Sequence, residues 1–275
     1  MDEGRSRCRA ARATIRKIDG ETALSETLVV SNVSIALGGR TILRDINFSA
    51  AAGEFVGIIG ANGAGKTTLL RILLGLLKPD TGMVKVLDRP VRRGSKLIGY
   101  VSQRTVVDPE LPLRGRDFVG FGLDGEKWGF SLPSKQRAAQ VTEALRAVGA
   151  LAYADAPVGK LSGGEQQRLF IAQALLSDPK IVLLDEPLSN LDIASASEIV
   201  KVVDGLRRSH GVTVLFVTHD INPLIEVMDR VIYLAAGRAA VGPVDQVVRE
   251  EVLSKLYGYH VDVIRVGDRV VVLTP

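Results

Sequence analysis

The chain has 275 residues, of which 46% are hydrophobic and 24% are charged, and its formal net charge is +4 at pH 7. This composition supplies enough apolar residues for a core of one large or two modest domains, and it suits an α/β fold. No apolar run approaches the roughly 18–20 residues that cross a bilayer, so we expect a chain that does not span a membrane.

The segment 1–27 is rich in arginine and lacks the apolar stretch of a secretory signal. We predict a disordered, solvated arm here. Contact with anionic lipid or nucleic acid is the alternative, but no aromatic residues are interleaved with these charges, and we expect no nucleic-acid partner. Cys8 is the only cysteine, so an intrachain disulfide is excluded, which fits a reducing cytosol.

Ordered structure is expected to begin near Leu28, with strands at 28–37 and 41–49 joined by a hairpin turn at Gly38-Gly39. A strand at 54–59 then leads through a glycine-rich loop into a helix that starts near Lys66. Further strands are expected at 82–87 and 97–101.

The pattern changes between residues 104 and about 165, where prolines and glycines punctuate the chain and 135–148 has helical periodicity. We predict a helical subdomain inserted into an α/β core. Beyond it, the short apolar runs 181–184 and 212–217 indicate strands buried on both faces. A helix at about 193–209 lies between them and completes a βαβ unit. The tail predicts a hairpin at Ala236-Gly237, a helix at about 244–257, and a last hairpin that turns at Gly267-Asp268.

A phosphate-binding loop follows the strand at 54–59. The sequence matches G-x-x-x-x-G-K-[ST], with a strand before it and a helix after it, as this motif requires. Backbone N–H groups of such a loop surround phosphate oxygens, and the helix dipole favours the same anion. Lys66 is expected to reach the β- and γ-phosphates and Thr67 to bind Mg²⁺, with Thr68 beside it. The loop residues are Gly60, Ala61, Asn62, Gly63, Ala64, Gly65, Lys66 and Thr67.

Two acidic residues, Asp185 and Glu186, end the apolar strand at 181–184. A buried unpaired charge is costly, so adjacent acids at this position favour a functional role. We predict that Asp185 holds Mg²⁺ through water, and that Glu186 points to the opposite face and polarises the attacking water. The alternative is a helix cap ahead of Pro187. With the phosphate-binding loop, these acids predict a P-loop NTPase that holds its nucleotide together with Mg²⁺.

A second anion-binding sequence, far from the first, opens a helix with Ser-Gly-Gly. Here the chain resembles the ATPases of ABC transporters, whose signature motif has this form. The resemblance implies a homodimer, in which the signature of one subunit closes over the nucleotide held by the other. It also implies a RecA-like core, an antiparallel β subdomain and the helical subdomain, within a domain at 28–260 followed by a hairpin extension at 261–275. The signature residues are Leu161, Ser162, Gly163, Gly164 and Glu165.

Three more segments match this family in order along the chain. Gln103 resembles the Q-loop residue, which contacts Mg²⁺ and signals to the membrane subunits, and 189–192 resembles the D-loop of the dimer seam. His219 resembles the switch histidine that contacts the γ-phosphate and the attacking water. One residue departs from the pattern: Leu37 occupies the place of the aromatic residue that usually stacks on adenine, which puts nucleotide affinity or selectivity in doubt.

The single cassette and the modest insertion between Gln103 and Leu161 favour a transporter ATPase over ribosome-associated or DNA-repair relatives. The details most resemble the ATPases of manganese and zinc importers, with iron-chelate importers as the alternative. The strings that carry this resemblance are 100–104, 108–112, 188–192 and 256–258. The resemblance implies a peripheral subunit on the cytoplasmic face of the membrane, bound to permease subunits and served indirectly by an extracytoplasmic substrate-binding protein.

Two expectations concern contacts of the chain itself. The apolar stretch 117–123 either contacts a membrane subunit through Phe118, Val119 and Phe121 or packs the core of the helical subdomain. The histidines are His210, His219 and His260, and they are not clustered. We therefore expect that this chain does not bind the transported metal.

Overall fold

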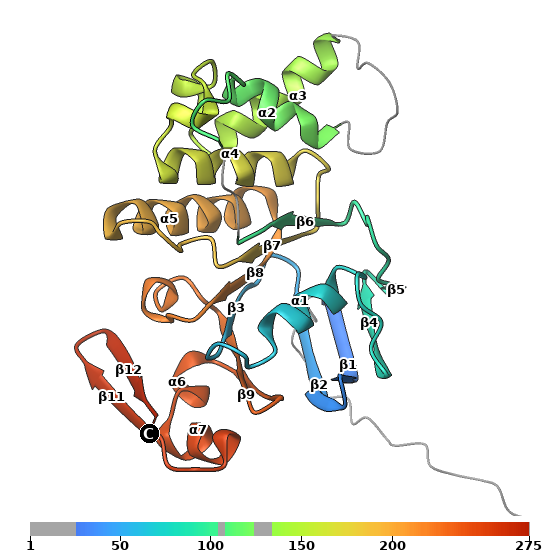
Figure 1. Ribbon diagram of the computed structural model, residues 1–275, viewed down its shortest axis with the longest axis vertical. Helices are drawn as coiled ribbons and strands as arrows, with labels where there is room; N and C mark the ends of the chain where they lie inside the picture. The colour runs from blue at the N-terminus through green and yellow to red at the C-terminus, as the bar shows by residue number, and fades with distance from the viewer. Residues whose placement is uncertain (1–25, 104–107, 124–133, 275) are drawn as a thin grey trace, which may run out of the picture.

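The computed structural model describes residues 26–103, 108–123 and 134–274. A six-stranded sheet in the order β10-β9-β3-β8-β7-β6 forms its centre (Figure 1). All of its strands run parallel except β10, which pairs antiparallel with β9 at the edge. The strands are β3 (Phe55–Ile59), β6 (Ile98–Val101), β7 (Ile181–Asp185), β8 (Thr213–Thr218), β9 (Arg230–Ala235) and β10 (Arg238–Gly242).

The central strands β3, β7 and β8 are buried along their whole length. Successive side chains of each strand point to opposite faces, so every strand serves two cores. Phe55 of β3 and Phe216 of β8 stack with ring centroids 5.8 Å apart in one core. Val56 and Leu215 belong to the other core, which the antiparallel sheet and α1 (Lys66–Leu73) complete. The continuous apolar runs in the sequence therefore reflect burial on both faces.

A separate antiparallel sheet has the order β2-β1-β4-β5. Its first strand begins at Glu26, not at Leu28 as expected, because Glu26 pairs with Ala51 and Thr27 is buried at 3% exposure. The predicted hairpin turn between the first two strands is confirmed, and the positive φ of Gly38 and Gly39 accounts for it. The strands are β1 (Glu26–Leu37), β2 (Arg40–Ala51), β4 (Thr81–Val86) and β5 (Arg89–Pro90).

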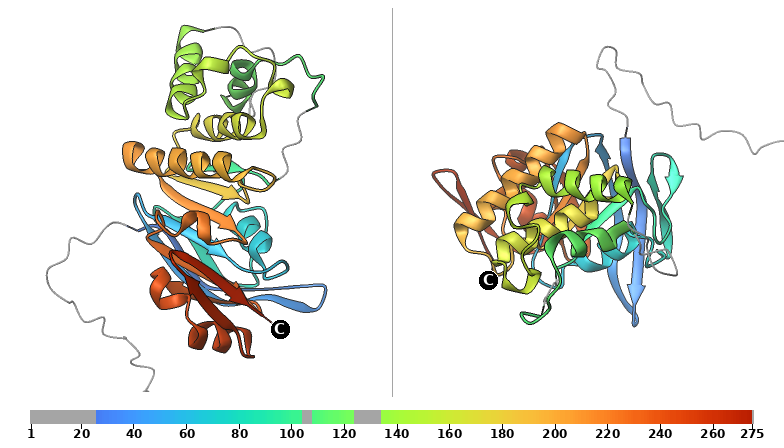
Figure 2. Two further views of the ribbon diagram at one scale, coloured as in Figure 1. Left: turned by 90° about the vertical axis from the view of Figure 1, so that its left-hand side faces the viewer. Right: turned by 90° about the horizontal axis from the view of Figure 1, so that it is seen from above.

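Helices α2 to α4 gather at one end of the molecule, beyond α5 (Figure 1 and the left view of Figure 2). In this group Val119 is fully buried and Phe118 packs edge-to-face on Phe170, with ring centroids 4.9 Å apart. Phe121 alone of the predicted apolar cluster is well exposed, at 53%. The cluster therefore serves mainly to pack this helical segment. The helices are α2 (Gly115–Gly120), α3 (Lys135–Ala147), α4 (Gly163–Leu175) and α5 (Ile193–His210).

The helix expected at about 244–257 is two helices, α6 (Val244–Val247) and α7 (Glu250–Tyr257). The break falls at Val248 and Arg249, whose backbones leave the helical region (Arg249 has φ −130° and ψ 147°). The last hairpin pairs β11 (Asp262–Val266) with β12 (Arg269–Leu273), as predicted. Within the described ranges, no helix combines the length and apolar character that crossing a bilayer requires.

Candidate functional site

Four groups of the predicted site residues follow neighbouring parallel strands. The phosphate-binding loop follows β3, His219 follows β8, Glu186 follows β7, and Gln103 follows β6. The strands are in register, so that their carboxyl ends lie at one edge of the sheet. This edge is where open parallel sheets place their ligand sites. Tertiary pairing therefore brings together groups that are spread over more than half of the sequence.

Close packing leaves no room for a side chain at two glycines of the phosphate-binding loop. An added Cβ at Gly60 would lie 2.4 Å from the Leu234 carbonyl oxygen. Gly65 has φ +102° and its Cβ would lie 2.7 Å from a methyl group of Leu43. Both clashes involve packed groups, and the positive φ disfavours any residue with a side chain. The loop therefore owes its shape to close packing against β2 and β9.

Lys66 opens α1 and turns back over the loop. Its Nζ donates hydrogen bonds to the carbonyl oxygens of Gly60 at 2.6 Å and Ala61 at 3.2 Å. The side chain lies 3.8 Å from Glu186 Oε1. Burial lowers the pKa of Lys66, and the charges of Glu186 and Asp185 act against that effect. The ammonium group thus lies over the loop, bound by two backbone carbonyl oxygens and near the Glu186 carboxylate. An anionic phosphate can take the place of these partners.

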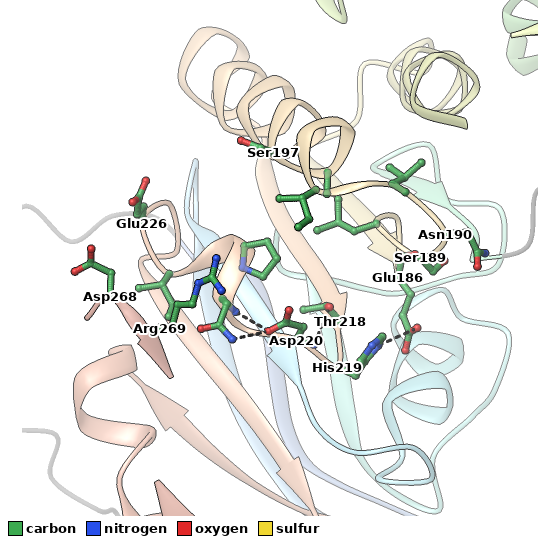
Figure 3. A pocket seen from close by; sticks show the side chains of 17 residues that line it. Glu186, Ser189, Asn190, Ser197, Thr218, His219, Asp220, Glu226, Asp268 and Arg269 are labelled. Carbon is green, nitrogen blue, oxygen red and sulfur yellow. Dashed lines mark hydrogen bonds and ion pairs between the residues drawn. The ribbon is translucent and has the colours of Figure 1, made fainter. Parts of the chain in front are cut away.

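The Glu186 carboxylate contacts three other predicted site residues. Gln103 Nε2 donates to its Oε2 at 3.0 Å. His219 Nδ1 lies 3.4 Å from the same oxygen, and Figure 3 shows this second contact. The expected strand alternation does not hold here, because β7 ends at Asp185 and Glu186 has φ +46°. Both carboxylates are consequently close enough to Lys66 to interact with its charge. This left-handed backbone at a non-glycine residue is typical of strained functional positions.

Asp185 has a partner that sequence reasoning missed. Tyr100, on the neighbouring strand β6, donates its hydroxyl to Asp185 Oδ2 at 3.3 Å. Burial raises the pKa of Asp185, and this hydrogen bond opposes the effect. Burial and the Asp185 charge raise the pKa of Tyr100 to about 12. In the sequence, Tyr100 stands three residues before Gln103, which could have marked it as a site residue. Only the pairing of β6 with β7 shows that its partner is Asp185.

The signature sequence caps α4. Ser162 accepts from Glu165 N–H at 3.3 Å, and the Glu165 carboxylate accepts from the backbone and hydroxyl of Ser162 at 2.8 Å. This reciprocal arrangement is a capping box. Ser162 and Gly163 are exposed. In the described chain, no hydrogen bond joins residues 161–165 to residues 60–68, and α4 begins well away from α1 (Figure 1).

The segment 189–192 lies between Glu186 and α5. Ser189 donates its hydroxyl to the Glu186 carbonyl oxygen at 2.8 Å, and Asp192 caps α5 by accepting from Ser195 N–H at 2.9 Å. Asn190 has φ +68°. Residues 189–191 of this segment line a groove of about 770 Å³ together with His219, Asp268 and Arg269 (Figure 3).

The donor groups predicted for Mg²⁺ are all oxygens: the Thr67 hydroxyl, the Asp185 carboxylate and the Gln103 amide oxygen. Such a set suits a hard cation that is held by one or two carboxylates together with substrate phosphates. The buried carboxylate of Asp185, whose pKa is raised, would gain from a nearby cation. The residues therefore fit Mg²⁺.

A site made of protein side chains alone is a different matter. Among the described residues, no group of three or more His, Cys, Asp or Glu side chains is placed to hold a metal ion.

Leu37, which occupies the predicted adenine-stacking position, ends β1 at the tip of the hairpin and pairs with Arg40. Its side chain is 41% exposed. An exposed aliphatic side chain can cover a base, but it lacks the π face that makes stacking specific. No aromatic ring takes the place of Leu37 in the hairpin turn, residues 37–40.

Comparison with known proteins defines the class. The family model described as "ABC transporter" matches residues 43–189. The manganese transport system ATP-binding protein MntB of Halalkalibacterium halodurans is 37% identical over 85% of this chain and 93% of its own length. The zinc import ATP-binding protein ZnuC of Pseudomonas fluorescens is 36% identical over 86% of this chain and 84% of its own length. A metal-chelate type ABC transporter in an inward-facing conformation gives a TM-score of 0.75 at 25% identity, covering 90% of this chain and 96% of that chain.

The fold is thus that of an ABC-type P-loop ATPase, as predicted. The chain belongs to the ABC transporter family, as an ATP-binding and ATP-hydrolysing subunit. Its resemblance to the ATPases of manganese and zinc importers is confirmed by sequence identity over most of the chain.

Proposed function

We propose that Glu186 is the general base for ATP hydrolysis, with Lys66 on the β- and γ-phosphates and His219 beside the attacking water. The contacts of Glu186 with Lys66, Gln103 and His219 support this proposal. A carboxylate held by two side chains can orient a water and accept its proton as the bond to phosphorus forms. The backbone N–H groups of residues 60–68 bind the phosphate oxygens, so that phosphoryl transfer depends mainly on positioning and charge neutralisation.

Mg²⁺ belongs to this proposal as a partner of the nucleotide. Thr67 and Gln103 would hold it directly, and Asp185 through water. When bound, the cation would neutralise charge on the phosphates. Tyr100 keeps the Asp185 carboxylate oriented through its hydroxyl, so that this oxygen ligand is in place before nucleotide arrives.

The active form in this proposal is a homodimer in which each signature closes over the nucleotide of the other subunit. Two features of residues 161–165 support it. Ser162 and Gly163 are exposed at the start of α4, where helix N–H groups attract anions. These residues also make no hydrogen bond to the phosphate-binding loop of their own chain. A signature that is exposed and separate from its own loop can serve a second chain.

The transported substrate is proposed to be a divalent metal ion, manganese or zinc, moved inward through separate permease subunits. We prefer this substrate to an iron chelate because the chain is 37% identical to MntB and 36% identical to ZnuC. The chain would sit on the cytoplasmic face of the membrane as a peripheral subunit. An extracytoplasmic binding protein would deliver the metal to the permease. Phe121, the exposed member of the predicted apolar cluster, is the candidate for permease contact.

Uptake in the native host tests the proposal. A deletion strain is complemented with the wild-type chain, with Glu186→Gln, or with Glu226→Gln, which changes an acid in the same groove outside the proposed machinery. Accumulation of radioactive manganese, zinc and an iron chelate is then measured. We expect wild type and Glu226→Gln to restore manganese or zinc uptake and Glu186→Gln to restore neither. Restoration of iron-chelate uptake alone would assign the chain to the other class of importer.

A further inference from the structure

The C-terminal hairpin β11–β12 is tied to the segment that carries His219. Asn222 stands three residues after His219, and its side chain makes two hydrogen bonds to one residue of β12. Its Nδ2 donates to the Val270 carbonyl oxygen at 3.0 Å, and its Oδ1 accepts from Val270 N–H at 2.8 Å. These contacts join residues 48 positions apart.

The amide of Asn222 is also fixed from the other side. Asp220 Oδ1 accepts from the backbone N–H of Asn222 at 3.0 Å and from its Nδ2 at 2.8 Å (Figure 3). Both amide hydrogens are therefore used, and only one orientation of the group satisfies all three partners. Asp220 N–H in turn donates to the Thr218 hydroxyl at 3.1 Å. A continuous set of hydrogen bonds thus runs from the end of β8, past His219, to the hairpin.

The hairpin provides a firm anchor for this set. Val270 is 4% exposed and belongs to the same core as Ile221 and Leu224, which flank Asn222 in sequence. His219, by contrast, has a side chain that is 61% exposed and meets the Glu186 carboxylate at 3.4 Å. An exposed histidine keeps such a geometry only if its backbone is held.

We propose that Asn222 is a positioning residue, through which the C-terminal hairpin holds the His219 segment so that His219 meets Glu186. The inference rests on the proposed role of His219 in hydrolysis. Among the described residues, the side chain of Asn222 hydrogen-bonds Asp220 and Val270 and not the phosphate-binding loop, so we expect its loss to leave nucleotide binding intact. The loss of Asn222 instead slows the catalytic step, because His219 is no longer held in place. Misplacement of a catalytic group by about 1 Å can slow a reaction by up to about 100-fold.

The test is steady-state ATP hydrolysis by the full-length chain, with kcat and KM determined separately. We expect Asn222→Ala to lower kcat about tenfold and to change KM for ATP less than about twofold. Val271→Ala, on the outward face of the same hairpin, is the matched control and keeps both constants. Wild-type kcat in Asn222→Ala, or a loss seen only in KM, would overturn the proposal.

The same substitution in a His219→Ala background separates positioning from general damage. Because Asn222 acts through His219, adding Asn222→Ala to His219→Ala leaves the residual kcat unchanged. A further tenfold fall in the double variant would show that Asn222 acts by another route. If His219→Ala itself turned over like wild type, the proposed role of His219 would fail, and so would the catalytic part of this inference.

Hydrogen exchange supplies a readout that does not depend on turnover. In Asn222→Ala, amide exchange is expected to rise at residues 219–222 and at Val270, while residues 60–70 stay as in wild type. Asn222→Ser, which is too short to reach Val270, serves the same purpose if the alanine variant does not fold. Unchanged exchange at 219–222 in a folded variant would show that the hairpin does not hold this segment.

Discussion

Gln103 Nε2 donates a 3.0 Å hydrogen bond to Glu186 Oε2, although the two residues stand 83 positions apart in the sequence. The contact exists because β6 and β7 are parallel neighbours whose ends lie side by side. Gln103 also stands at the start of the connection to the helical segment. Strand pairing therefore places the Gln103 amide directly beside the proposed base.

Replacing the proposed base is the most direct test of the hydrolytic site. We expect Glu186→Gln to bind ATP normally and to lose at least about 100-fold in kcat, because an amide cannot accept the proton of the attacking water. ATP should then accumulate a closed dimer, visible by size-exclusion chromatography. Normal phosphate release, with a monomer at every ATP concentration, would contradict this assignment. Glu226→Gln is the matched control.

Removal of the loop lysine should act on binding. Lys66→Ala deletes the cation that faces the phosphates, and hydrogen bonds from charged groups contribute about 1.5–3 kcal/mol, so ATP affinity is expected to fall roughly 10- to 100-fold. Calorimetric titration measures this directly. Lys78→Ala removes an exposed lysine just after the first helix and should bind ATP like wild type. Equal affinities in the two variants would refute the role of Lys66.

Complementation between two defective chains tests whether the signature acts on the other subunit. Homodimers of Ser162→Ala and of Lys66→Ala are each expected to hydrolyse ATP poorly. A heterodimer of the two keeps one site with an intact loop and an intact signature, and it should regain about half of wild-type turnover. Differential tags allow its isolation. If the purified heterodimer stays as inactive as its parents, the two motifs do not form a shared site.

Ionisation of the buried Asp185 carboxylate lowers the free energy of unfolding, because burial raises the pKa of this group. The folded chain holds the proton of this group more tightly than the unfolded chain, so ionisation opposes folding above the ordinary pKa of 3.8. Asp185→Asn should therefore raise the melting temperature of the nucleotide-free protein at pH 7. The gain should vanish as the pH falls below 3.8, where both states are protonated. Adding ATP and Mg²⁺ should stabilise wild type more than this variant, because the variant keeps the phosphate-binding loop but lacks the carboxylate proposed to hold Mg²⁺. A lower melting temperature of the variant at pH 7 would contradict the burial argument.

Leu37 gives a prediction about nucleotide affinity. Leu37→Tyr supplies a ring at the tip of the first hairpin, and stacking on adenine is worth about 0.5–1.5 kcal/mol. ATP affinity should then rise roughly 2- to 10-fold with kcat unchanged. Leu76→Tyr adds a ring at another exposed leucine and should not change affinity. If both variants bind ATP like wild type, adenine does not lie over residue 37.

Several features were readable from the sequence because local chemistry specifies them. The glycine-rich loop is one, since Gly65 at φ +102° admits no other residue without strain. The strands at 181–185 and 213–218 are another, because burial on both faces requires continuous apolar runs. The order of these motifs along the chain was enough to indicate the family that the comparisons confirm.

Other features depend on contacts between distant segments. The direction of Glu186 follows from a left-handed backbone after β7, which strand alternation does not anticipate. The break between α6 and α7 lies in a sequence with continuous helical character. The partners of Tyr100 and Asn222 come from strand pairing and from the docked C-terminal hairpin. The sequence by itself determined which chemical groups this protein carries, because motifs are local; only the tertiary structure decided which groups touch, because strand order brings separate loops to one edge of the sheet.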